Sequence, residues 1–247
     1  MTREEHDFLA SYDPAAFDRP SVTVDLVLMS VRDGALYALL MRRPAPPAQG
    51  KWALPGGFVR MDEDLDAAAS RILREKAQIA SAYLEQLYTF GAVDRDPRTR
   101  IITVAYFALL PAARFAKALD AAGERALARI ATAWTGETGG RAEAYGENGE
   151  RLALAFDHAD ILGLAVKRLR GKLDYSQVGF ELLPAQFTLR QLQEVHEAIL
   201  GVRFNKPAFR RRMLDKGVLE ATGRREEGVT FRPAELFRFS RNKRADA

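Results

Sequence analysis

The chain has 247 residues, of which 47% are apolar and none is cysteine, so it can form one large or two modest cores but no disulfide or thiolate metal site. No apolar run approaches the roughly 20 residues of a membrane span, and no signal peptide is recognisable, which predicts a cytoplasmic protein without membrane attachment. The net charge of +4 is uneven, because the segment from Lys172 to the end has 15 lysines and arginines against 10 acidic residues. A basic C-terminal third is typical of an attached nucleic-acid-binding module.

The N-terminal half predicts strands arranged around a glycine-rich loop and a helix. Residues 1–20 are polar with two prolines and predict an ordered arm or a short helix. Two strands joined by a glycine turn at 32–34 form a hairpin, and residues 44–50 form an irregular loop. A helix is expected over 65–78, capped by Asp62 or Asp64. The predicted strands cover 21–31, 35–43, 83–93, 100–110, 128–134 and 151–154, with a turn at 148–149. Residues 111–127 fit either a helix or a loop.

The C-terminal half predicts a helix followed by a separate small domain. A helix begins after Asp157 and is expected to stop at Gly171, as a connector or a dimer helix. Thr188 and Gln191 form a capping box that starts the next helix, which Gly201 ends. Asn205 caps a further helix over 206–216, which Gly217 ends. Strands are then expected at 218–221, 229–231 and 236–239, with a polar turn at 222–228. Helix, tight turn, helix and hairpin in this order indicate a winged helix-turn-helix.

The helix over 206–216 has the pattern of a recognition helix. Phe209 and Met213 lie on one stripe, Arg211 points away from it, and Arg210 and Arg212 flank it. Arginine binds phosphates or the guanine edge bidentately, so DNA binding is favoured over a solvated basic helix in a small packing domain. The predicted DNA contacts are Thr188, Arg190, Lys206, Arg210, Arg211, Arg212, Arg224, Arg225 and Arg232.

The stretch from Gly56 to Ile79 resembles the Nudix box, whose pattern is G-x5-E-x7-R-E-U-x-E-E-x-G-U with U apolar. The matching positions are Gly57, Glu63, Arg71, Leu73, Glu75 and Ile79. The pattern is broken at three positions, where a glutamate is replaced by Ile72, a glutamate by Lys76 and the glycine by Gln78. The alternative is an ordinary amphipathic helix after a glycine-rich turn.

The resemblance implies a site that has lost its metal. In the Nudix family, glutamates matching positions 72, 75 and 76 share one helical face and hold Mg²⁺ against a diphosphate. Here that face offers one carboxylate, one branched alkane and one ammonium, so no metal and no catalytic residue is expected. The chain's three histidines, His6, His158 and His196, are far apart in sequence, and surface or capping positions are expected for each.

Taken as a whole, the chain resembles the Nudix-related transcriptional regulator (NrtR) family. The resemblance extends over FLASYDP (8–14), RPSVTVDLVL (19–28), WALPGGFV (52–59), LAFDHADIL (154–162), FELLPAQFTLRQLQEVHEAILG (180–201), KPAFRRRML (206–214) and RPAELFRF (232–239). It implies an α+β protein with a Nudix α/β/α sandwich and mixed sheet over 1–155, a connecting segment over 156–186 and a winged helix-turn-helix over 187–247. It also implies a homodimer that binds palindromic double-stranded operator DNA and releases it on binding ADP-ribose or a related nucleotide sugar.

By position in the box, the effector pocket is expected to involve the loop and its helix. The predicted ligand contacts are Trp52, Gly56, Gly57, Arg60, Glu63, Arg71, Glu75 and Arg98. Trp52 is equally consistent with a core position, and Arg71 with a tether that pairs with Glu63 and does not touch ligand. Arg95 lies on the same loop as Arg98, from which a diphosphate is within reach.

Two other functions are compatible with the pattern. The first is an active Nudix hydrolase that cleaves ADP-ribose and carries a DNA-binding appendage, which Ile72 and Lys76 argue against. The second is an interaction protein that has lost both ligands, which the arginines of 206–212 and 224–232 argue against. A ligand-responsive regulator, most simply a repressor, agrees best with both halves.

Overall fold

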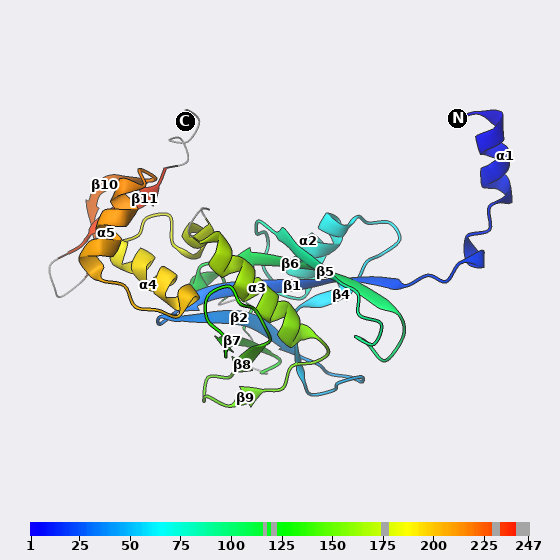
Figure 1. Cartoon of the computed structure of the whole chain (residues 1–247), viewed down its shortest axis with the longest axis horizontal. Helices are drawn as coiled ribbons and strands as arrows, with labels where there is room; N and C mark the ends of the chain where they lie inside the picture. Colours follow the sequence, from blue (N-terminus) through cyan, green and yellow to red (C-terminus); the bar gives the residue numbers. More distant parts are fainter. Residues whose placement is uncertain (116–117, 120–122, 174–177, 229–232, 241–247) are drawn as a thin grey trace.

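The computed structural model describes the chain except for residues 116–117, 120–122, 174–177, 229–232 and 241–247 (Figure 1). Its elements, in chain order, are α1 (Arg3–Ser11), η1 (Pro14–Ala16), β1 (Ser21–Arg32), β2 (Ala35–Arg42), β3 (Trp52–Ala53), β4 (Gly56–Phe58), α2 (Leu65–Glu75), β5 (Glu85–Phe90), β6 (Ile101–Leu109), η2 (Ala112–Phe115), β7 (Arg125–Thr132), β8 (Ala142–Tyr145), β9 (Arg151–Leu152), α3 (His158–Lys172), η3 (Val178–Leu182), α4 (Leu189–Leu200), α5 (Lys206–Asp215), β10 (Leu219–Arg225) and β11 (Glu235–Phe239). None of the helices in the described ranges has the length and apolar run that crossing a bilayer requires.

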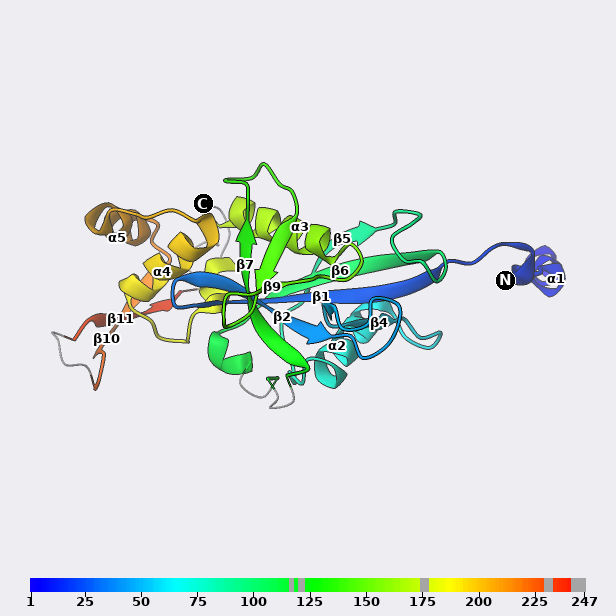
Figure 2. The same cartoon turned by 90° about the horizontal axis from the view of Figure 1, so that it is seen from below.

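Strands β1 to β9 form one mixed sheet in the order β5-β6-β1-β2-β7-β8-β9, with β3 paired to β2 and β4 paired to β1 (Figure 2). The long central strands β1 and β6 run parallel from the pair Ser21 and Ile101 to the pair Met29 and Leu109. The other pairs are antiparallel, including the predicted hairpin of β1 and β2. Asp33 and Gly34 turn this hairpin with φ of 51° and 71°, the left-handed conformation for which a glycine was expected.

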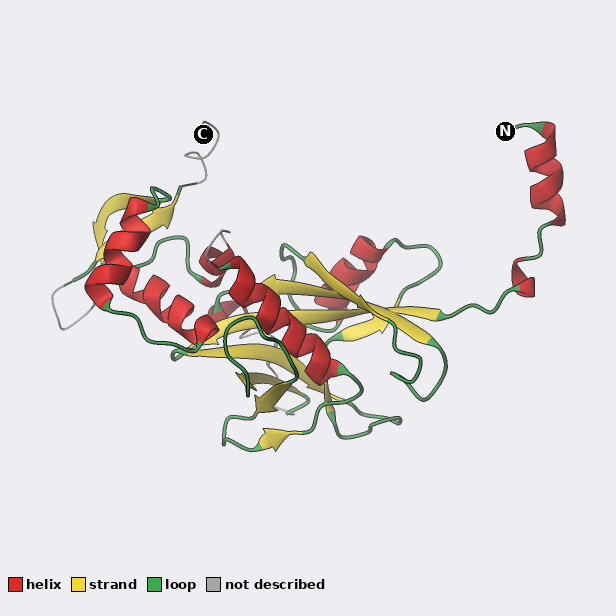
Figure 3. Cartoon of the chain, viewed as in Figure 1, coloured by secondary structure: helices red, strands yellow, loops and turns green. Residues whose placement is uncertain are grey.

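Alternating side chains of β1 pack into two separate apolar cores, one on each face of the sheet. Val24, Leu26 and Leu28 pack on the side of α2, whereas Val27 and Met29 pack on the side of α3. Because successive residues of a strand face opposite sides of a sheet, this continuous apolar run indicates a strand covered on both faces. The sheet is therefore the middle layer of the expected α/β/α sandwich (Figure 3).

The box helix α2 begins as predicted and ends earlier. Asp64 caps it by accepting a hydrogen bond from Ala67 N at 2.7 Å. The helix stops at Glu75, three residues before the expected end. Gln78 then has φ of 55°, so the left-handed turn that the box builds with glycine is kept although the glycine is lost.

Several boundaries in the middle of the chain differ from the expectation. β7 starts at Arg125 and ends at Thr132, and β8, which was not predicted, pairs with it over 142–145. The turn at 148–149 is confirmed by a φ of 80° at Gly149. In the undecided stretch 111–127, the described part contains the short helix η2 and the start of β7. β8 is short and alternates small and polar residues, so its sequence carries little strand signal.

Helix α3 covers the second face of the sheet and runs to Lys172. Gly171 therefore lies inside the helix, and its prediction as the stop was wrong. Gly171 does not adopt the left-handed conformation by which glycine ends a helix, and the next residue, Lys172, pairs with Glu85 of β5 on the sheet. The buried residues of α3 include Ile161, Leu162 and Leu169, and all three belong to the same apolar cluster as the sheet.

The C-terminal elements form the expected winged helix-turn-helix. Thr188 and Gln191 form the capping box of α4, and Gly201 ends that helix with φ of 70°. Asn205 caps α5 by accepting from Ala208 N at 3.1 Å. The hairpin differs, because the expected turn residues 222–225 belong to β10, with a register shift between Ala221 and Arg225. The strand expected at 229–231 lies outside the described residues.

The winged helix packs directly on the sandwich. Leu192, Val195 and Ile199 of α4 belong to the apolar cluster that includes Val27 of β1 and Leu40 of β2. α4 lies beside the ends of β1 and β2 in both views (Figures 1 and 2). One continuous core therefore joins the two parts of the molecule.

Candidate ligand site and nucleic-acid interface

The double glycine of the box lies in β4, against the buried carboxylate of Asp25. Gly56 pairs with Asp25, and a Cβ atom at Gly56 would lie 2.1 Å from Asp25 Oδ1 and 3.0 Å from Val24 O. No side chain fits there, so Gly56 is required by a close approach of two strands. A Cβ at Gly57 would meet Ile72 Cδ1 at 3.6 Å, an ordinary contact.

Arg71 and Glu63 hold the box loop together. Arg71 Nε and Nη2 donate to Glu63 Oε2 and Oε1 at 2.9 and 2.5 Å, and Nη2 also donates to Phe58 O at 2.9 Å. Glu63 Oε1 accepts from Arg60 N at 2.9 Å. The Arg71 guanidinium lowers the pKa of Glu63 to about 2, so the pair is ionic near neutrality. This is the tether that the sequence left as an alternative for Arg71.

The face that would hold Mg²⁺ does not fit the ion. Ile72 is fully buried, whereas Glu75 and Lys76 are exposed, so the three positions do not form the shared face that was expected. Glu75 lies 3.4 Å from Arg71 Nη1 and 3.7 Å from Arg60 Nη2. A dication here would meet one carboxylate and three cationic side chains, although Mg²⁺ requires an octahedral shell of oxygens. In the described part of the chain, no three His, Cys, Asp or Glu side chains gather as a metal site.

A buried ionic network lies beneath Gly56, and sequence reasoning missed it. Arg95 Nε and Nη2 donate to Asp157 Oδ2 and Oδ1 at 2.9 and 2.8 Å, and Nη2 lies 3.7 Å from Asp25 Oδ2. Thr103 Oγ1 donates to the same Asp25 oxygen at 2.7 Å. The Arg95 side chain is only 5% exposed, so it is committed to this network and not available to a diphosphate. The sequence signal for this network was Asp157 in LAFDHADIL. The other members, Arg95 and Asp25, are 62 residues or more away from it in sequence.

Two of the three histidines are buried and neither caps a helix, so the expectation of surface or capping positions was wrong for them. His158 Nδ1 accepts from Leu54 N at 2.9 Å, and burial lowers the pKa of the imidazole, which leaves it neutral. His196 is also 4% exposed, with Nδ1 2.9 Å from Leu192 O. In each ring a backbone group lies within hydrogen-bond distance of Nδ1. The other nitrogen of His158, Nε2, lies 4.0 Å from Asp25 Oδ1, so this ring borders the buried ionic network.

Trp52 and Arg98 lie at the edges of the predicted pocket. Trp52 is half-buried, packs against the core and forms a bridge with Leu154, which supports the core alternative for its side chain. Arg98 Nη2 donates to Asp96 Oδ2 at 2.8 Å, and its guanidinium lies 5.6 Å from the ring centre of Phe58. The Arg98 side chain is 42% exposed, so it remains accessible to a ligand next to the box loop.

Helix α5 buries one stripe and exposes its cations. Phe209 and Met213 are 3% and 1% exposed, as the periodicity predicts. The exposed cationic side chains on the other faces are Lys206, Arg210, Arg211 and Arg212. Arg212 lies over the ring of Phe204 at 5.1 Å, which leaves Arg211 as the arginine opposite the buried stripe.

Arginines from three elements line one hollow between α4, α5 and the hairpin. Arg190, Arg210 and Arg225 all border this hollow of about 400 Å³. Arg224 is exposed on β10, and Arg232 lies outside the described residues. Thr188 is 2% exposed and its hydroxyl accepts from Gln191 N, so the structure assigns it to capping α4 and not to a surface contact.

Both halves match known families. A NUDIX domain model matches residues 19–130, and a model of the NrtR DNA-binding winged helix domain matches residues 179–239. The chain is 39% identical over 238 residues to an ADPR responsive transcriptional repressor NtrR of Acinetobacter baylyi, covering 96% of this chain and 88% of that protein. The chain belongs to the NrtR family.

Solved NrtR structures have the same fold. The crystal structure of Shewanella oneidensis NrtR complexed with a 27mer DNA superposes with a TM-score of 0.72 at 33% identity, covering 89% of this chain and 93% of that one. The NUDIX domain of the same NrtR, complexed with ADP ribose, gives a TM-score of 0.50 at 33% identity and covers 68% of this chain and 99% of that one. The winged helix after a mixed α/β sandwich is thus the NrtR architecture.

Helix α3, which lies between the two matched stretches, contacts both ends of this NrtR-family molecule. At its start, Asp157 and His158 hold Arg95 and the backbone of Leu54 beside the box. Near its end, Arg170 Nε donates to Ile199 O in the last turn of α4 at 2.9 Å. The same guanidinium lies 4.7 Å over the ring of Trp134. One rigid element therefore connects the residues around Gly56 to the DNA-binding domain.

Proposed function

We propose that this protein is a repressor that binds operator DNA through α5 and the β10–β11 hairpin and releases it when ADP-ribose or a related nucleotide sugar binds beside the box. The observation that carries the proposal is one apolar core shared by the winged helix, with its exposed arginines, and the Nudix-type sheet. The box on that sheet lacks the carboxylates that would bind a metal, because its Glu75 pairs with Arg71. Its support from relatives is the ADPR responsive repressor of Acinetobacter and the Shewanella structures with DNA and with ADP ribose.

The effector site is the loop at Gly56 and Gly57 with the accessible cations around it. Arg60 and Arg98 have side chains that are 59% and 42% exposed, and Lys76 adds a third exposed cation where the box has a glutamate. These groups can bind the phosphates of a diphosphate directly, as charged donors do without a metal. Glu63 and Arg71 act beneath them by fixing the loop.

The same site is proposed to hold its ligand without cleaving it. Hydrolysis in a Nudix box relies on a metal to neutralise phosphate oxygens and orient water. Glu75 is the one box carboxylate on the exposed face, and two arginines already contact it. No metal or other cofactor is therefore required, and turnover of ADP-ribose is not expected with Mg²⁺ or Mn²⁺.

The DNA site uses the exposed arginines of α5 for the major groove and the hairpin for the flanking backbone. Arg211 is opposite the buried stripe, where a side chain of a recognition helix reaches base edges. Arg190, Arg210 and Arg225 surround the hollow at the start of α4 and are placed for phosphates. A homodimer would present two such surfaces to the half-sites of a palindrome.

Fluorescence anisotropy with a labelled duplex from the chain's own upstream region tests the proposal. ADP-ribose should weaken DNA binding, and DNA should weaken ADP-ribose binding by the same factor in calorimetry. Arg211→Ala should weaken specific binding by about 1–3 kcal/mol. Arg151→Ala, which also removes an exposed arginine, but from β9 of the sandwich, is the matched control and should bind nearly as wild type.

Two results would contradict the proposal. Specific DNA affinity that is the same with and without millimolar ADP-ribose and related nucleotide sugars would remove the effector role. ADP-ribose cleavage at roughly 1 s⁻¹ or faster would instead establish the hydrolase alternative.

A further inference from the structure

Glu197 is a buried carboxylate on α4, beside the segment 201–205 that returns along this helix before α5 begins (Figure 1). Its side chain is only 8% exposed. Burial disfavours an ionised carboxylate unless polar or charged donors surround it. Hydrogen bonds from the Gln193 side chain and from the Phe204 backbone, followed by the Arg203 guanidinium, lower its pKa to about 2. Glu197 is therefore ionised near neutrality, inside a small domain where an apolar side chain would be easier to bury.

Gln193 and Glu197 hold the backbone of Phe204 at both of its polar groups. Glu197 Oε1 accepts from Phe204 N at 2.9 Å and from Gln193 Nε2 at 2.7 Å. Gln193 Nε2 also donates to Phe204 O at 3.1 Å. Glu197 Oε2 accepts from Arg203 Nη1 at 2.7 Å. Within the described ranges, residues 202–204 make no hydrogen bond to other backbone groups, so the two side chains of α4 fix this segment.

Phe204 transmits this anchorage to the recognition helix α5. It directly precedes Asn205, the N-cap of α5, and its ring lies 5.5 Å from the ring of Phe209. Arg212, one turn further along the helix, lies over the Phe204 ring at 5.1 Å. Phe209 and Met213 hold α5 through apolar contacts, which are not directional. The hydrogen bonds at Phe204 are directional and therefore set where the first turn of α5 points.

The anchored segment borders the basic surface of the domain, at a hollow of about 560 Å³ between α4 and α5. The charged side chains in its lining are two carboxylates, Glu194 and Glu197, each paired with an arginine, and the cations Arg190, Arg203, Lys206 and Arg210. An unpaired carboxylate here would repel DNA phosphates, so its pairing with Arg203 allows a negatively charged anchor beside this surface. A shift of the first turn of α5 would move Lys206 and Arg210 relative to α4.

We propose that Glu197 is a positioning residue for DNA recognition, because it fixes the segment between α4 and α5 and thereby the angle at which α5 presents its arginines to base edges. This role rests on the proposed binding of DNA through α5 and deepens it. Bidentate contacts to bases require one geometry, whereas phosphates are reached from many directions. Glu197 therefore governs the preference for the operator over other DNA and contributes little to the affinity for DNA as such.

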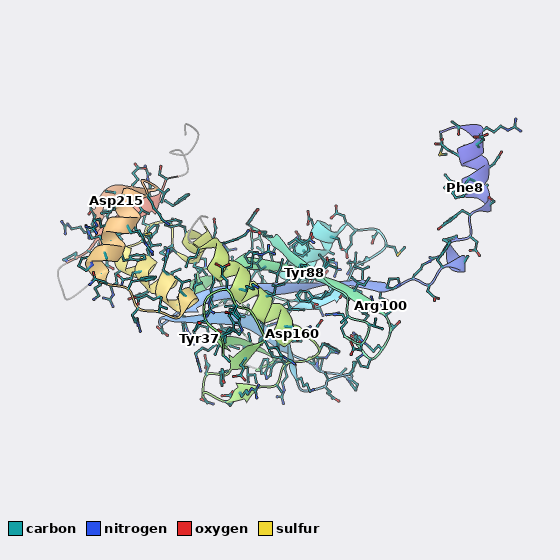
Figure 4. The ribbon with its side chains drawn as sticks, in the orientation of Figure 1. Phe8, Tyr37, Tyr88, Arg100, Asp160 and Asp215 are labelled. Atoms are coloured by element: carbon teal, nitrogen blue, oxygen red, sulfur yellow. The ribbon has the colours of Figure 1, made fainter. Side chains whose placement is uncertain are left out.

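Fluorescence anisotropy of the full chain tests this role with two duplexes, one selected by the wild-type protein from a random pool and its scrambled counterpart. Glu197→Ala should lower the ratio of selected to scrambled affinity at least about tenfold, the cost of losing one base contact. Its affinity for the scrambled duplex should stay within about threefold of wild type, because that binding is electrostatic. Asp215→Ala is the charge-matched control, since it removes an exposed carboxylate from the opposite end of α5 (Figure 4), and it should keep the ratio.

Two further measurements separate positioning from charge and from stability. Glu197→Gln has the same net charge as Glu197→Ala but keeps an oxygen that accepts from Phe204 N, so it should recover most of the ratio. Hydrogen exchange of the Phe204 amide should be slow in wild type and in Glu197→Gln, and fast in Glu197→Ala. Urea unfolding identifies a variant that fails to fold. If Glu197→Ala does not fold, Gln193→Met, which removes the bond to Phe204 O, should lower the ratio at least about threefold.

The outcomes distinguish the role of Glu197 from the DNA-binding function. A folded Glu197→Ala variant with the wild-type ratio would overturn the positioning role and leave DNA binding intact. An equal loss in Asp215→Ala, or no recovery in Glu197→Gln, would trace the effect to charge and overturn the role as well. A wild-type chain that enriches no sequence from the pool would contradict the proposed function itself, and the positioning role with it.

Discussion

Arg170 of α3 contacts the DNA-binding domain directly, through a hydrogen bond to the last turn of α4. Its guanidinium donates to Ile199 O at 2.9 Å, to Trp134 O at 3.2 Å, to Gly136 O at 3.3 Å and to Thr132 Oγ1 at 3.2 Å. Burial lowers the pKa of Arg170, so the group has given up water for these contacts. Arg170→Met keeps a long side chain and removes all four.

The size of the effect follows from these contacts. A hydrogen bond from a charged donor contributes about 1.5–3 kcal/mol, and desolvation of the guanidinium offsets a large part of the total. In Arg170→Met, the methionine side chain can still pack on Trp134, and water can replace the guanidinium as the hydrogen-bond partner of Ile199 O. We therefore expect Arg170→Met to lower the free energy of unfolding by about 2 kcal/mol.

Urea unfolding measures that loss, and anisotropy with and without ADP-ribose measures the coupling. Arg170→Met should bind DNA while losing most of the release by ADP-ribose, because α3 no longer positions the last turn of α4. Arg168→Met is the matched control on the same helix, since Arg168 Nη2 donates to Leu87 O within the sandwich at 3.2 Å. It should respond to ADP-ribose as wild type does. Full release in Arg170→Met, with wild-type stability, would refute the role assigned to Arg170.

Three further outcomes follow from the box. The pKa of Glu63 is lowered to about 2 by Arg71, so the stabilisation from their pair is complete above about pH 4.5 and is lost as the pH falls towards 2; acid unfolding of Glu63→Gln should lack this part of the pH dependence. Gln78→Gly should raise the free energy of unfolding by about 0.5–1 kcal/mol, because glycine relieves the left-handed conformation at φ of 55° at some cost in chain entropy; thermal unfolding that shows no gain would count against strain there. Ile72→Glu should lower the free energy of unfolding by roughly 3 kcal/mol, because the carboxylate would enter the core. An Ile72→Glu variant as stable as wild type would show that this position can face the solvent.

The regular parts of the fold were predictable because their signals are local. The capping box at Thr188, the cap at Asn205 and the stripe of Phe209 and Met213 each depend on residues within one or two turns. The same locality explains the errors. Gly171 has the composition of a helix stop, but contacts on the sheet continue the helix for another residue.

The site was predictable only in outline. The sequence predicted that Arg71 can tether the box loop by pairing with Glu63, and the structure contains that pair. The network of Asp25, Arg95 and Asp157 was not predictable, because it joins a strand, a loop and a helix cap that are distant in sequence. Such pairings are fixed by the sheet order, which a local pattern does not specify.

A sensor and a hydrolase place opposite demands on the same loop. A hydrolase must bind the transition state more tightly than its substrate, and in this fold the metal supplies much of that difference. A sensor must instead bind its effector differently in two conformations of the protein. Here Arg71 and Glu63 keep the loop rigid, Lys76 substitutes a fixed cation for a ligand carboxylate, and Ile72 fills the core. In the function proposed here, the retained part of the box would hold a diphosphate and the altered part would prevent its cleavage. The apolar core shared by α3 and α4 and the hydrogen bond from Arg170 to Ile199 O would then connect occupancy of the box to the arginines of α5.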